Sequence, residues 1–289
     1  MSVRRRSELT SYALGETSEQ LLHSIALQTY VGEYFLWYYK ALIRIMVEDR
    51  AMSRLGDHSI VSHQAWVTAR KELLVMEKEF NRLRDELNLC RQDLPWERID
   101  KQYVFTGPNG EESLSDLFDG RSQLIIYHFM FDPDWEEGCK SCSYLADHYG
   151  PATVHLANRD VTMVTVSRAP LAKLDAFKKR MGWNFKWVSS EGNDFNRDYH
   201  VLFDPKELET GEAYYNYKTQ PFPVADGPGI SVFAKYEEGH IFHTYSSYAR
   251  GLDMFIGAYH LLDIVPKGRD EAGLDYSMEW IRHHDRYED

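Results

Sequence analysis

The chain has 289 residues, 43% of them hydrophobic and 14% aromatic, which suits one main domain with additions and a sizeable core. Its formal net charge is −12 and its pI is near 5.5. A negative protein repels phosphate backbones and anionic lipid surfaces, which disfavours nucleic acid as a partner. Its three cysteines, Cys90, Cys139 and Cys142, lack the even, dispersed pattern of a secreted scaffold. They predict a reducing, cytoplasmic location and a functional pair.

The sequence predicts neither a signal peptide nor a membrane span. No apolar core follows the basic start at residues 4–6. The most apolar long stretch, residues 31–47, is interrupted by Glu33, Lys40 and Arg44. A soluble protein with no membrane partner is expected.

The first 95 residues are expected to be helical. Residues 1–59 form an N-terminal extension with an aromatic middle, and residues 60–95 contain a long helix from about 62 to 91, with Ser62 as its N-cap. Its apolar residues recur in steps of three and four: Trp66, Ala69, Leu73, Met76, Phe80, Leu83, Leu87 and Cys90. This heptad pattern predicts either a homodimeric coiled coil or a helix packed on the main domain, and the two have equal weight. At a position in this pattern, Cys90 is interpreted as a small core residue.

From residue 96 to 266 the pattern is that of an α/β domain. Predicted strands cover residues 102–106, 123–130, 161–166, 229–235 and 240–245. Helices are expected from Cys139 to Gly150, from there to about 159, from Pro170 to 181 and over 250–264, whereas residues 183–226 show no clear pattern. Residues 267–289 are a tail with a short helix around 274–282. The order of elements begins with a βαβ unit and finishes with an antiparallel hairpin.

The feature with the clearest chemistry is the segment Cys139-Lys140-Ser141-Cys142, between a buried strand and a helix. A sulfur at a helix N-terminus is favoured as a thiolate, because free backbone N–H groups and the helix dipole stabilise negative charge. Cys139 is therefore predicted to attack a disulfide, and Cys142, one turn inward, to resolve the mixed disulfide. Lys140 favours the thiolate further and is a candidate for positioning the substrate.

Four carboxylates, Asp132, Asp134, Glu136 and Glu137, precede the dithiol. If they face Cys139 they raise its pKa, and if they face solvent the helix dipole dominates. The sequence leaves this open.

Other residues are candidates for positioning the substrate. Pro228, between Gly227 and Gly229, precedes a strand, and in a thioredoxin-like fold a cis-proline stands opposite the dithiol; an ordinary turn is the alternative. Trp135 is interpreted as an apolar lip for the substrate or as a core residue, and Ser143 follows the dithiol on the helix.

A metal site is less favoured. Zinc would need two ligands besides the cysteines, and no histidine shows ligand spacing with the pair. His128 is interpreted as a hydrogen-bonded core residue, and His283 with His284 as solvated surface. No metal and no cofactor is predicted.

Several motifs resemble those of a bacterial and fungal family described as predicted dithiol–disulfide oxidoreductases. They are DGRSQL (119–124), YHFMF (127–131), PDWEEGC (133–139), VSRAP (166–170), RMGW (180–183), WVSS (187–190), PGISVF (228–233), HTYS (243–246) and YARGLD (248–253). The resemblance covers about residue 60 to the end. It implies an α/β, thioredoxin-like fold, a central mixed sheet flanked by helices, with Cys139 and Cys142 as the redox pair.

The chain departs from this family at Asp132, where glycine is usual, and at Glu191 and His200. Residues 1–59 have no counterpart in it. The peroxiredoxin motif Pro-x-x-x-Thr-x-x-Cys is also absent, because Asp132 and Glu136 occupy the proline and threonine places before Cys139. Peroxide reduction by that mechanism is disfavoured.

The function expected from these observations is thiol–disulfide exchange with a protein or small disulfide, with an unknown thiol as electron donor. One alternative is a non-catalytic thioredoxin-like scaffold that binds partners through its N-terminal helices. Another is a copper- or zinc-binding thioredoxin relative.

Overall fold

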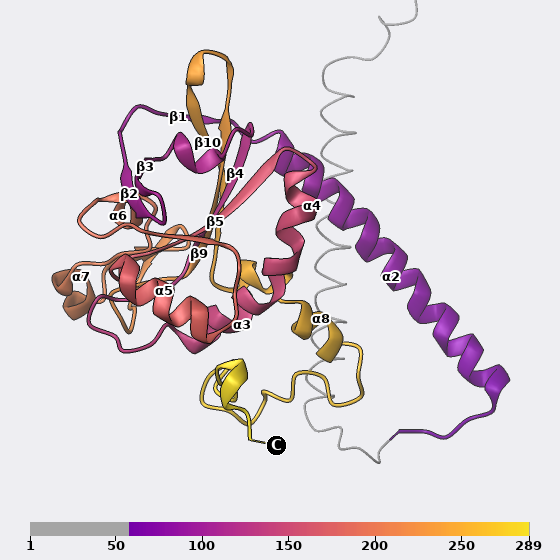
Figure 1. Cartoon of the computed structure of the whole chain (residues 1–289). Coiled ribbons are helices and arrows are strands. Elements are labelled where there is room, and N and C mark those ends of the chain that lie inside the picture. Colours follow the sequence, from indigo (N-terminus) through magenta and orange to yellow (C-terminus); the bar gives the residue numbers. More distant parts are fainter. Residues whose placement is uncertain (1–57, 289) are drawn as a thin grey trace, which may run out of the picture. The chain divides into compact units, whose positions relative to one another are not determined.

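The computed structural model describes residues 58–288 (Figure 1), so the expected extension over residues 1–59 lies almost wholly outside the described residues. The helices, in chain order, are α2 (His63–Gln92), α3 (Lys140–Tyr149), α4 (Thr153–Ala157), α5 (Leu171–Arg180), α6 (Phe195–Asp198), α7 (Pro205–Thr210) and α8 (Gly257–Leu262). Turns of 3-10 helix are η1 (Asp116–Phe118), η2 (Gly150–Ala152), η3 (Glu237–Gly239), η4 (Ala249–Phe255) and η5 (His284–Arg286). Among these, no helix has the length and apolar character needed to cross a membrane.

Eight strands of the described residues form one mixed sheet. They are β1 (Glu97–Ile99), β2 (Val104–Gly107), β3 (Gly110–Ser113), β4 (Gln123–His128), β5 (Val161–Ser167), β6 (Lys186–Ser189), β9 (Gly229–Lys235) and β10 (Ile241–Tyr248). β7 (Ala213–Tyr215) and β8 (Lys218–Gln220) form a separate hairpin.

The order across the sheet is β1-β10-β9-β4-β5-β6-β2-β3. β4, β5 and β6 are parallel, while β9 runs antiparallel to β4 and β10 antiparallel to β9. The centre is thus a βαβ unit, β4-α3-β5, joined by a β9-β10 hairpin and the following helix. This is the topology of a thioredoxin-like fold, as predicted.

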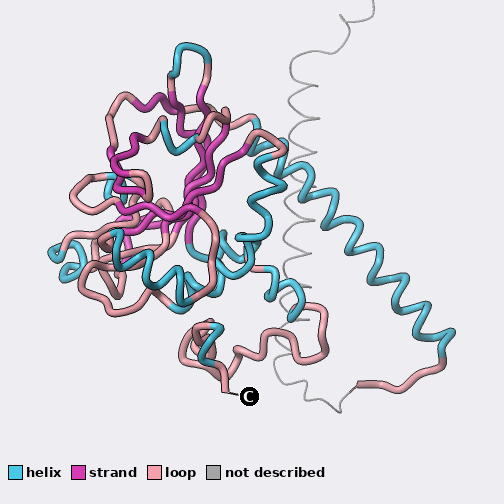
Figure 2. Tube along the Cα trace, viewed as in Figure 1, coloured by secondary structure: helices cyan, strands magenta, loops and turns pink. Residues whose placement is uncertain are grey.

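The central strands bury both faces because their apolar residues alternate between two cores. On β4, Leu124 and Ile126 pack with η1 and α6, whereas Tyr127 packs with α3, α5 and α8 on the opposite face. α3 and α5 lie below the strands in Figure 1, and the loops that lead into them gather at one end of the sheet (Figure 2). The core thus fixes where α3 begins.

α2 begins as predicted. The Ser62 hydroxyl accepts a hydrogen bond from the N–H of Ala65 at 3.3 Å, which satisfies one free donor of the first turn. The helix continues unbroken for 30 residues, and none of them is buried in the structure.

Two helices expected near the C-terminus form differently. The segment 250–264 contains η4 and α8, separated at Ile256, whose backbone is extended and whose side chain is buried. Residues 274–282 form turns, because the Glu271 carboxylate accepts hydrogen bonds from the backbone of Met278 and the indole of Trp280. In both segments tertiary contacts outweigh helical periodicity.

A pair of leucines tests the assignment of the core around α5. Leu174→Ala, which truncates a fully buried side chain, is expected to lower the free energy of unfolding by about 2–5 kcal/mol. Leu261→Ala on α8, at a side chain 65% exposed, is expected to change it by less than about 0.5 kcal/mol. Urea unfolding measures both, and equal effects would contradict the assignment.

Candidate active site

The two cysteines lie at the first turn of α3. Cys139 is the N-cap residue, with a non-helical backbone (φ −54°, ψ 129°), and it is partly exposed. Cys142 is buried against the core, with 2% of its surface exposed. Both are free thiols. The exposed sulfur is therefore the one at the helix terminus.

The surroundings separate the acidities of the two thiols. The hydrogen bond from the Cys142 thiol lowers the pKa of Cys139 to about 7, against the effect of burial and with help from two backbone N–H groups and the Lys140 charge. Desolvation by burial raises the pKa of Cys142 well above its ordinary value. Cys139 thus ionises first.

The chain approaches Cys139 through a tightly packed glycine. At Gly138 a Cβ atom would lie 2.7 Å from the ring of Phe129 and 2.9 Å from that of Phe177. Any larger residue would push the loop off the core. The N–H of Cys139 then donates to the carbonyl of Met130 at 3.1 Å, which ties the nucleophile to the end of β4.

The acidic loop does not direct its charge at the dithiol. Asp132 forms an ion pair with Arg168, and Glu137 forms one with Arg180 at 2.8 Å, while Asp134 and Glu136 are exposed. An arginine therefore offsets the charge of Asp132 and of Glu137, and solvent screens the charges of the two exposed carboxylates. This answers the question that the sequence left open about the acidic residues.

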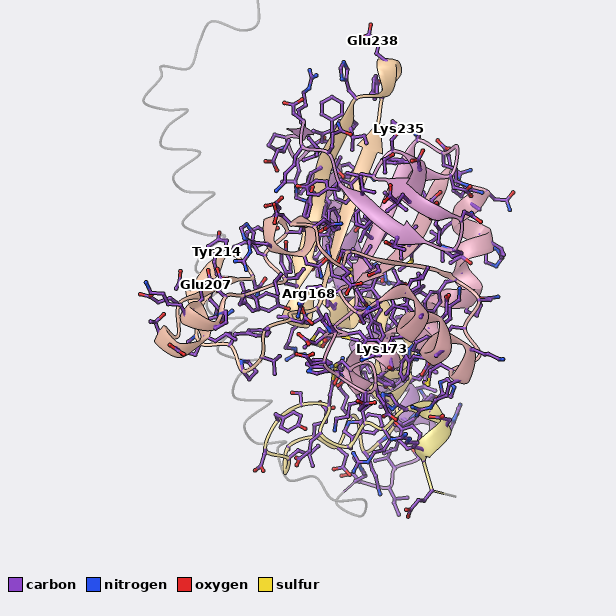
Figure 3. The ribbon with its side chains drawn as sticks, turned by 60° about the vertical axis from the view of Figure 1, so that its left-hand side comes forward. Arg168, Lys173, Glu207, Tyr214, Lys235 and Glu238 are labelled. Atoms are coloured by element: carbon purple, nitrogen blue, oxygen red, sulfur yellow. The ribbon has the colours of Figure 1, made fainter. Side chains whose placement is uncertain are left out.

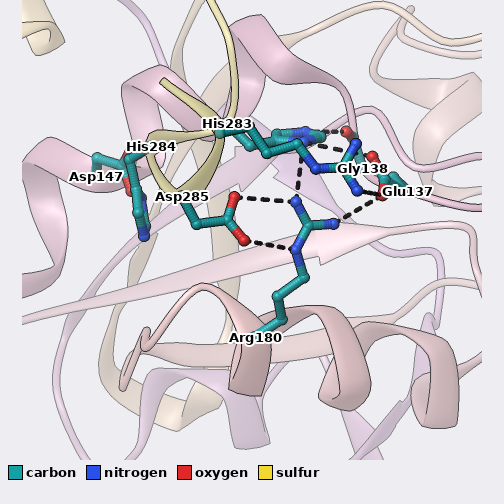
Figure 4. A network of polar contacts seen from close by, with 8 residues as sticks. Glu137, Gly138, Asp147, Arg180, His283, His284 and Asp285 are labelled. Atoms are coloured by element: carbon teal, nitrogen blue, oxygen red, sulfur yellow. Dashed lines mark hydrogen bonds and ion pairs between the residues drawn. The ribbon is translucent and has the colours of Figure 1, made fainter. Parts of the chain in front are cut away.

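The C-terminal tail holds the residue next to the nucleophile (Figure 4). The Nε2–H of His283 donates to the carbonyl of Gly138 at 2.9 Å, and its Nδ1 lies 3.4 Å from Glu137. Arg180 binds Asp285 in the same network, and Arg286 binds Glu137. His283 is 7% exposed, so its interpretation as solvated surface was wrong.

Arg168, labelled in Figure 3, connects two loops at this end of the sheet. It follows β5 and binds Asp132 of the acidic loop and Asp226, at 2.7 Å, just before Gly227. Asp226 is 3% exposed, and burial raises its pKa despite the arginine. A buried carboxylate needs such a partner, so Arg168 fixes the Pro228 loop relative to the acidic loop.

Gly227 and Pro228 lie at the same end of the sheet as the dithiol. Gly229, next to Pro228, pairs with His128 at the end of β4, two residues before the Met130 carbonyl that binds Cys139. The Pro228 carbonyl accepts a hydrogen bond from the Tyr215 hydroxyl at 2.7 Å. The cis form of the Gly227–Pro228 bond stays a prediction.

The other candidate positioning residues differ in their surroundings. Trp135 is partly buried against the core, and its carbonyl accepts a hydrogen bond from Lys173. The Lys140 ammonium donates to the carbonyl of Glu279 in the tail at 2.9 Å. Ser143 is fully buried, and its hydroxyl donates to the Cys139 carbonyl at 2.9 Å. Ser143 therefore supports the backbone of the nucleophile, and its role in positioning the substrate stays a prediction.

His128 is a hydrogen-bonded core residue, as predicted. Its Nε2 lies 2.9 Å from the Ser231 hydroxyl, and burial lowers its pKa to about 3, so the ring is neutral at pH 7. In the part of the chain that the structure describes, no cluster of three or more His, Cys, Asp or Glu residues could hold a metal ion.

Comparisons with known proteins place the chain in a family. The model described as a bacterial protein of unknown function (DUF899) matches residues 55–287. No curated protein matches the chain in sequence.

Among solved structures, peroxidoxin BcpB of Mycobacterium tuberculosis is similar at 11% identity and a TM-score of 0.38, covering 57% of this chain and 94% of that one. Peroxiredoxin Q of Xanthomonas campestris is similar at 15% identity and a TM-score of 0.39, covering 58% and 98%. A protein from Chlorobium tepidum assigned as the thiol:disulfide interchange protein DsbE is similar at 13% identity and a TM-score of 0.35, covering 57% and 98%.

The role of Cys142 in activating Cys139 can be measured by alkylation. In a Cys90→Ser background, the rate of Cys139 alkylation by iodoacetamide is expected to rise with pH around a midpoint of about 7, where the thiol ionises. Cys142→Ala removes the hydrogen bond that contributes most, so the midpoint should move upward, whereas Cys142→Ser keeps a hydroxyl donor and should move it less. Identical midpoints in all three proteins would contradict this role.

Two adjacent histidines test the contact between the tail and the loop. His283→Ala leaves the buried Gly138 carbonyl without its donor, which is expected to cost about 1–3 kcal/mol in the free energy of unfolding. His284, 42% exposed, pairs with Asp147 at the surface, so His284→Ala should cost less than about 1 kcal/mol. Chemical denaturation compares them, and a larger loss for His284→Ala would refute the assignment.

Proposed function

Since the chain belongs to the DUF899 family of bacterial proteins of unknown function, we propose its activity from its own residues: thiol–disulfide exchange by Cys139 and Cys142. The observation that carries the proposal is the asymmetry of the two thiols. Cys139 is partly exposed at a helix N-terminus with a lowered pKa, and Cys142 is buried with a raised one. This is the arrangement that a nucleophile and a resolving thiol require.

The proposed reaction transfers two electrons from the two thiols of the protein to the substrate disulfide. The Cys139 thiolate attacks one sulfur of a substrate disulfide, that S–S bond breaks, and the released substrate thiolate takes up a proton. Cys142 then loses its proton and attacks the Cys139 sulfur of the mixed disulfide, which frees the second substrate thiol. The substrate is reduced by two electrons and the protein holds a Cys139–Cys142 disulfide, which a thiol donor reduces again.

The hydrogen bond between the two thiols supports the second step. Hydrogen bonding from the Cys142 thiol is the largest cause of the lowered pKa of Cys139, so the two thiols interact before the substrate arrives. When Cys139 enters a mixed disulfide, its negative charge is lost, and with it one cause of the raised pKa of Cys142. Ionisation of the resolving thiol therefore becomes easier at the stage that needs it.

Contacts around the dithiol suggest how a substrate is held. Trp135, partly buried beside the nucleophile loop, is proposed to pack against the apolar part of the substrate. The backbone at Gly227 and Pro228 is proposed to pair with an extended stretch of a protein substrate. Lys140 is proposed to contribute positive charge beside the nucleophile. A reducing, cytoplasmic setting remains part of the proposal.

Replacement of each cysteine separates the two roles. Cys139→Ser is expected to lower disulfide reductase activity by at least about 100-fold, because a serine hydroxyl is not ionised at neutral pH. Cys142→Ser should allow the first attack but not resolution, so that a mixed disulfide with a small aromatic disulfide accumulates on Cys139. Mass spectrometry of intact protein detects this adduct, and a Cys90→Ser variant, which should keep full activity, is the control. Unchanged activity in Cys139→Ser would overturn the proposal.

A further inference from the structure

The apolar face of α2 is a surface that the main domain leaves exposed. Its eight residues occupy two rows with a spacing of seven: Trp66, Leu73, Phe80 and Leu87 in one row, and Ala69, Met76, Leu83 and Cys90 in the other. In heptad notation these are the a and d positions of four consecutive heptads. All eight side chains are exposed, including Phe80 at 65% and Trp66 at 55%. We call this set the α2 seam.

A helix of this kind needs a partner for its apolar face. Single helices are marginally stable in water, and most helical stability in proteins comes from packing an amphipathic face. A continuous row of exposed large side chains over 30 residues is also unusual for a surface that meets only solvent. Among the described residues, Arg91 in the last turn of α2 contacts the main domain: it lies over the Tyr245 ring and donates a hydrogen bond to the sulfur of Met254. These contacts leave the α2 seam uncovered.

The charges that flank the α2 seam indicate the partner and its direction. The g positions are Glu72, Glu79 and Glu86, and the e positions are Arg70, Glu77, Arg84 and Arg91. In a parallel pair each g residue faces the e residue five positions later on the other helix, which joins Glu79 to Arg84 and Glu86 to Arg91 and leaves only Glu72 facing Glu77. An antiparallel pair would place g against g, glutamate against glutamate throughout.

From this complementarity we propose that α2 forms a parallel two-stranded coiled coil with α2 of a second copy of this chain. Arg82, at position c, pairs with Glu79 and Glu86 within the helix and lowers their repulsion without covering the seam. The proposal does not depend on the redox chemistry. It does place the two Cys90 residues, at equivalent d positions, side by side.

The mass of the full chain in solution tests the dimer. Light scattering should give twice the 33.8 kDa of one chain, and Phe80→Glu should raise the dissociation constant on the order of 100-fold or more, because it puts a charge into the seam. Val75→Glu, at a side chain 67% exposed but at position c, should leave the mass unchanged. Because both side chains are exposed, neither change should disturb the folding of the main domain.

Two results would overturn the proposal. The first is a monomeric full chain; if Phe80→Glu destabilises that monomer and Val75→Glu does not, another segment of the same chain covers the seam. The second is a dimer that Val75→Glu disrupts as strongly as Phe80→Glu, which would place the interface elsewhere.

Cross-linking through Cys90 tests the parallel direction. In a full chain carrying Cys139→Ser and Cys142→Ser, mild oxidation should link two copies through Cys90 and give a covalent dimer on a non-reducing gel. In an antiparallel pair the two Cys90 residues would lie at opposite ends of the seam, roughly 36 Å apart, and no link could form. Asn81→Cys combined with Cys90→Ser, which moves the thiol to the outer face, should link much more slowly. An intact dimer that fails to cross-link through Cys90 contradicts the parallel arrangement.

Discussion

The N-terminus of α3 is the constraint on which the rest of the site depends. Its free N–H groups stabilise negative charge only within about the first turn. Cys139 lies there because its N–H donates to the carbonyl of Met130, two residues beyond β4, and because Gly138 fits between Phe129 and Phe177. The sheet therefore determines where the nucleophile lies, and the helix determines its charge.

The acidic loop would work against this charge if its carboxylates were unpaired. Arg168 binds the first of them and Arg180 the last, and the C-terminal tail adds His283 and Arg286 around Glu137. Arg168 and the C-terminal tail, which lie far apart in sequence, thus both bind the loop that precedes the dithiol. The tail, which follows the strands and helices of the thioredoxin-like core, is part of the support of the nucleophile.

Much of the core could be predicted from the sequence because its signals are local. The buried strands, the N-cap Ser62 and the dithiol at a strand–helix junction follow from periodicity and turn chemistry over a few residues. The residues that the sequence did not reveal make contacts with residues far away along the chain. Arg168 and His283 contact loops that are 58 and 145 residues away in sequence, at Asp226 and Gly138. The doublet of histidines in a charged tail carries no periodic signal, so only the fold could reveal that one of them is buried.

The helix predicted over 250–264 failed for a related reason. Its periodicity is real, but burial of Ile256 in an extended conformation outweighs the helical preference of the residues around it. Conversely, the heptads of α2 formed a helix as predicted, and none of its residues is buried in the structure. Local sequence patterns thus predicted most of the helices and strands, and tertiary contacts determined which of them pack around the dithiol.

The reduction potential of the Cys139–Cys142 pair shows whether the two thiols form a redox-active dithiol. Equilibration of the Cys90→Ser protein with glutathione buffers of set ratio, followed by thiol trapping and mass measurement, gives the fraction of disulfide at each potential. A redox-active pair should show one two-electron transition, between about −270 and −120 mV, the range of thioredoxin-like oxidoreductases. A pair that stays fully reduced at every ratio, or that oxidises only by linking separate chains, would contradict the proposed function.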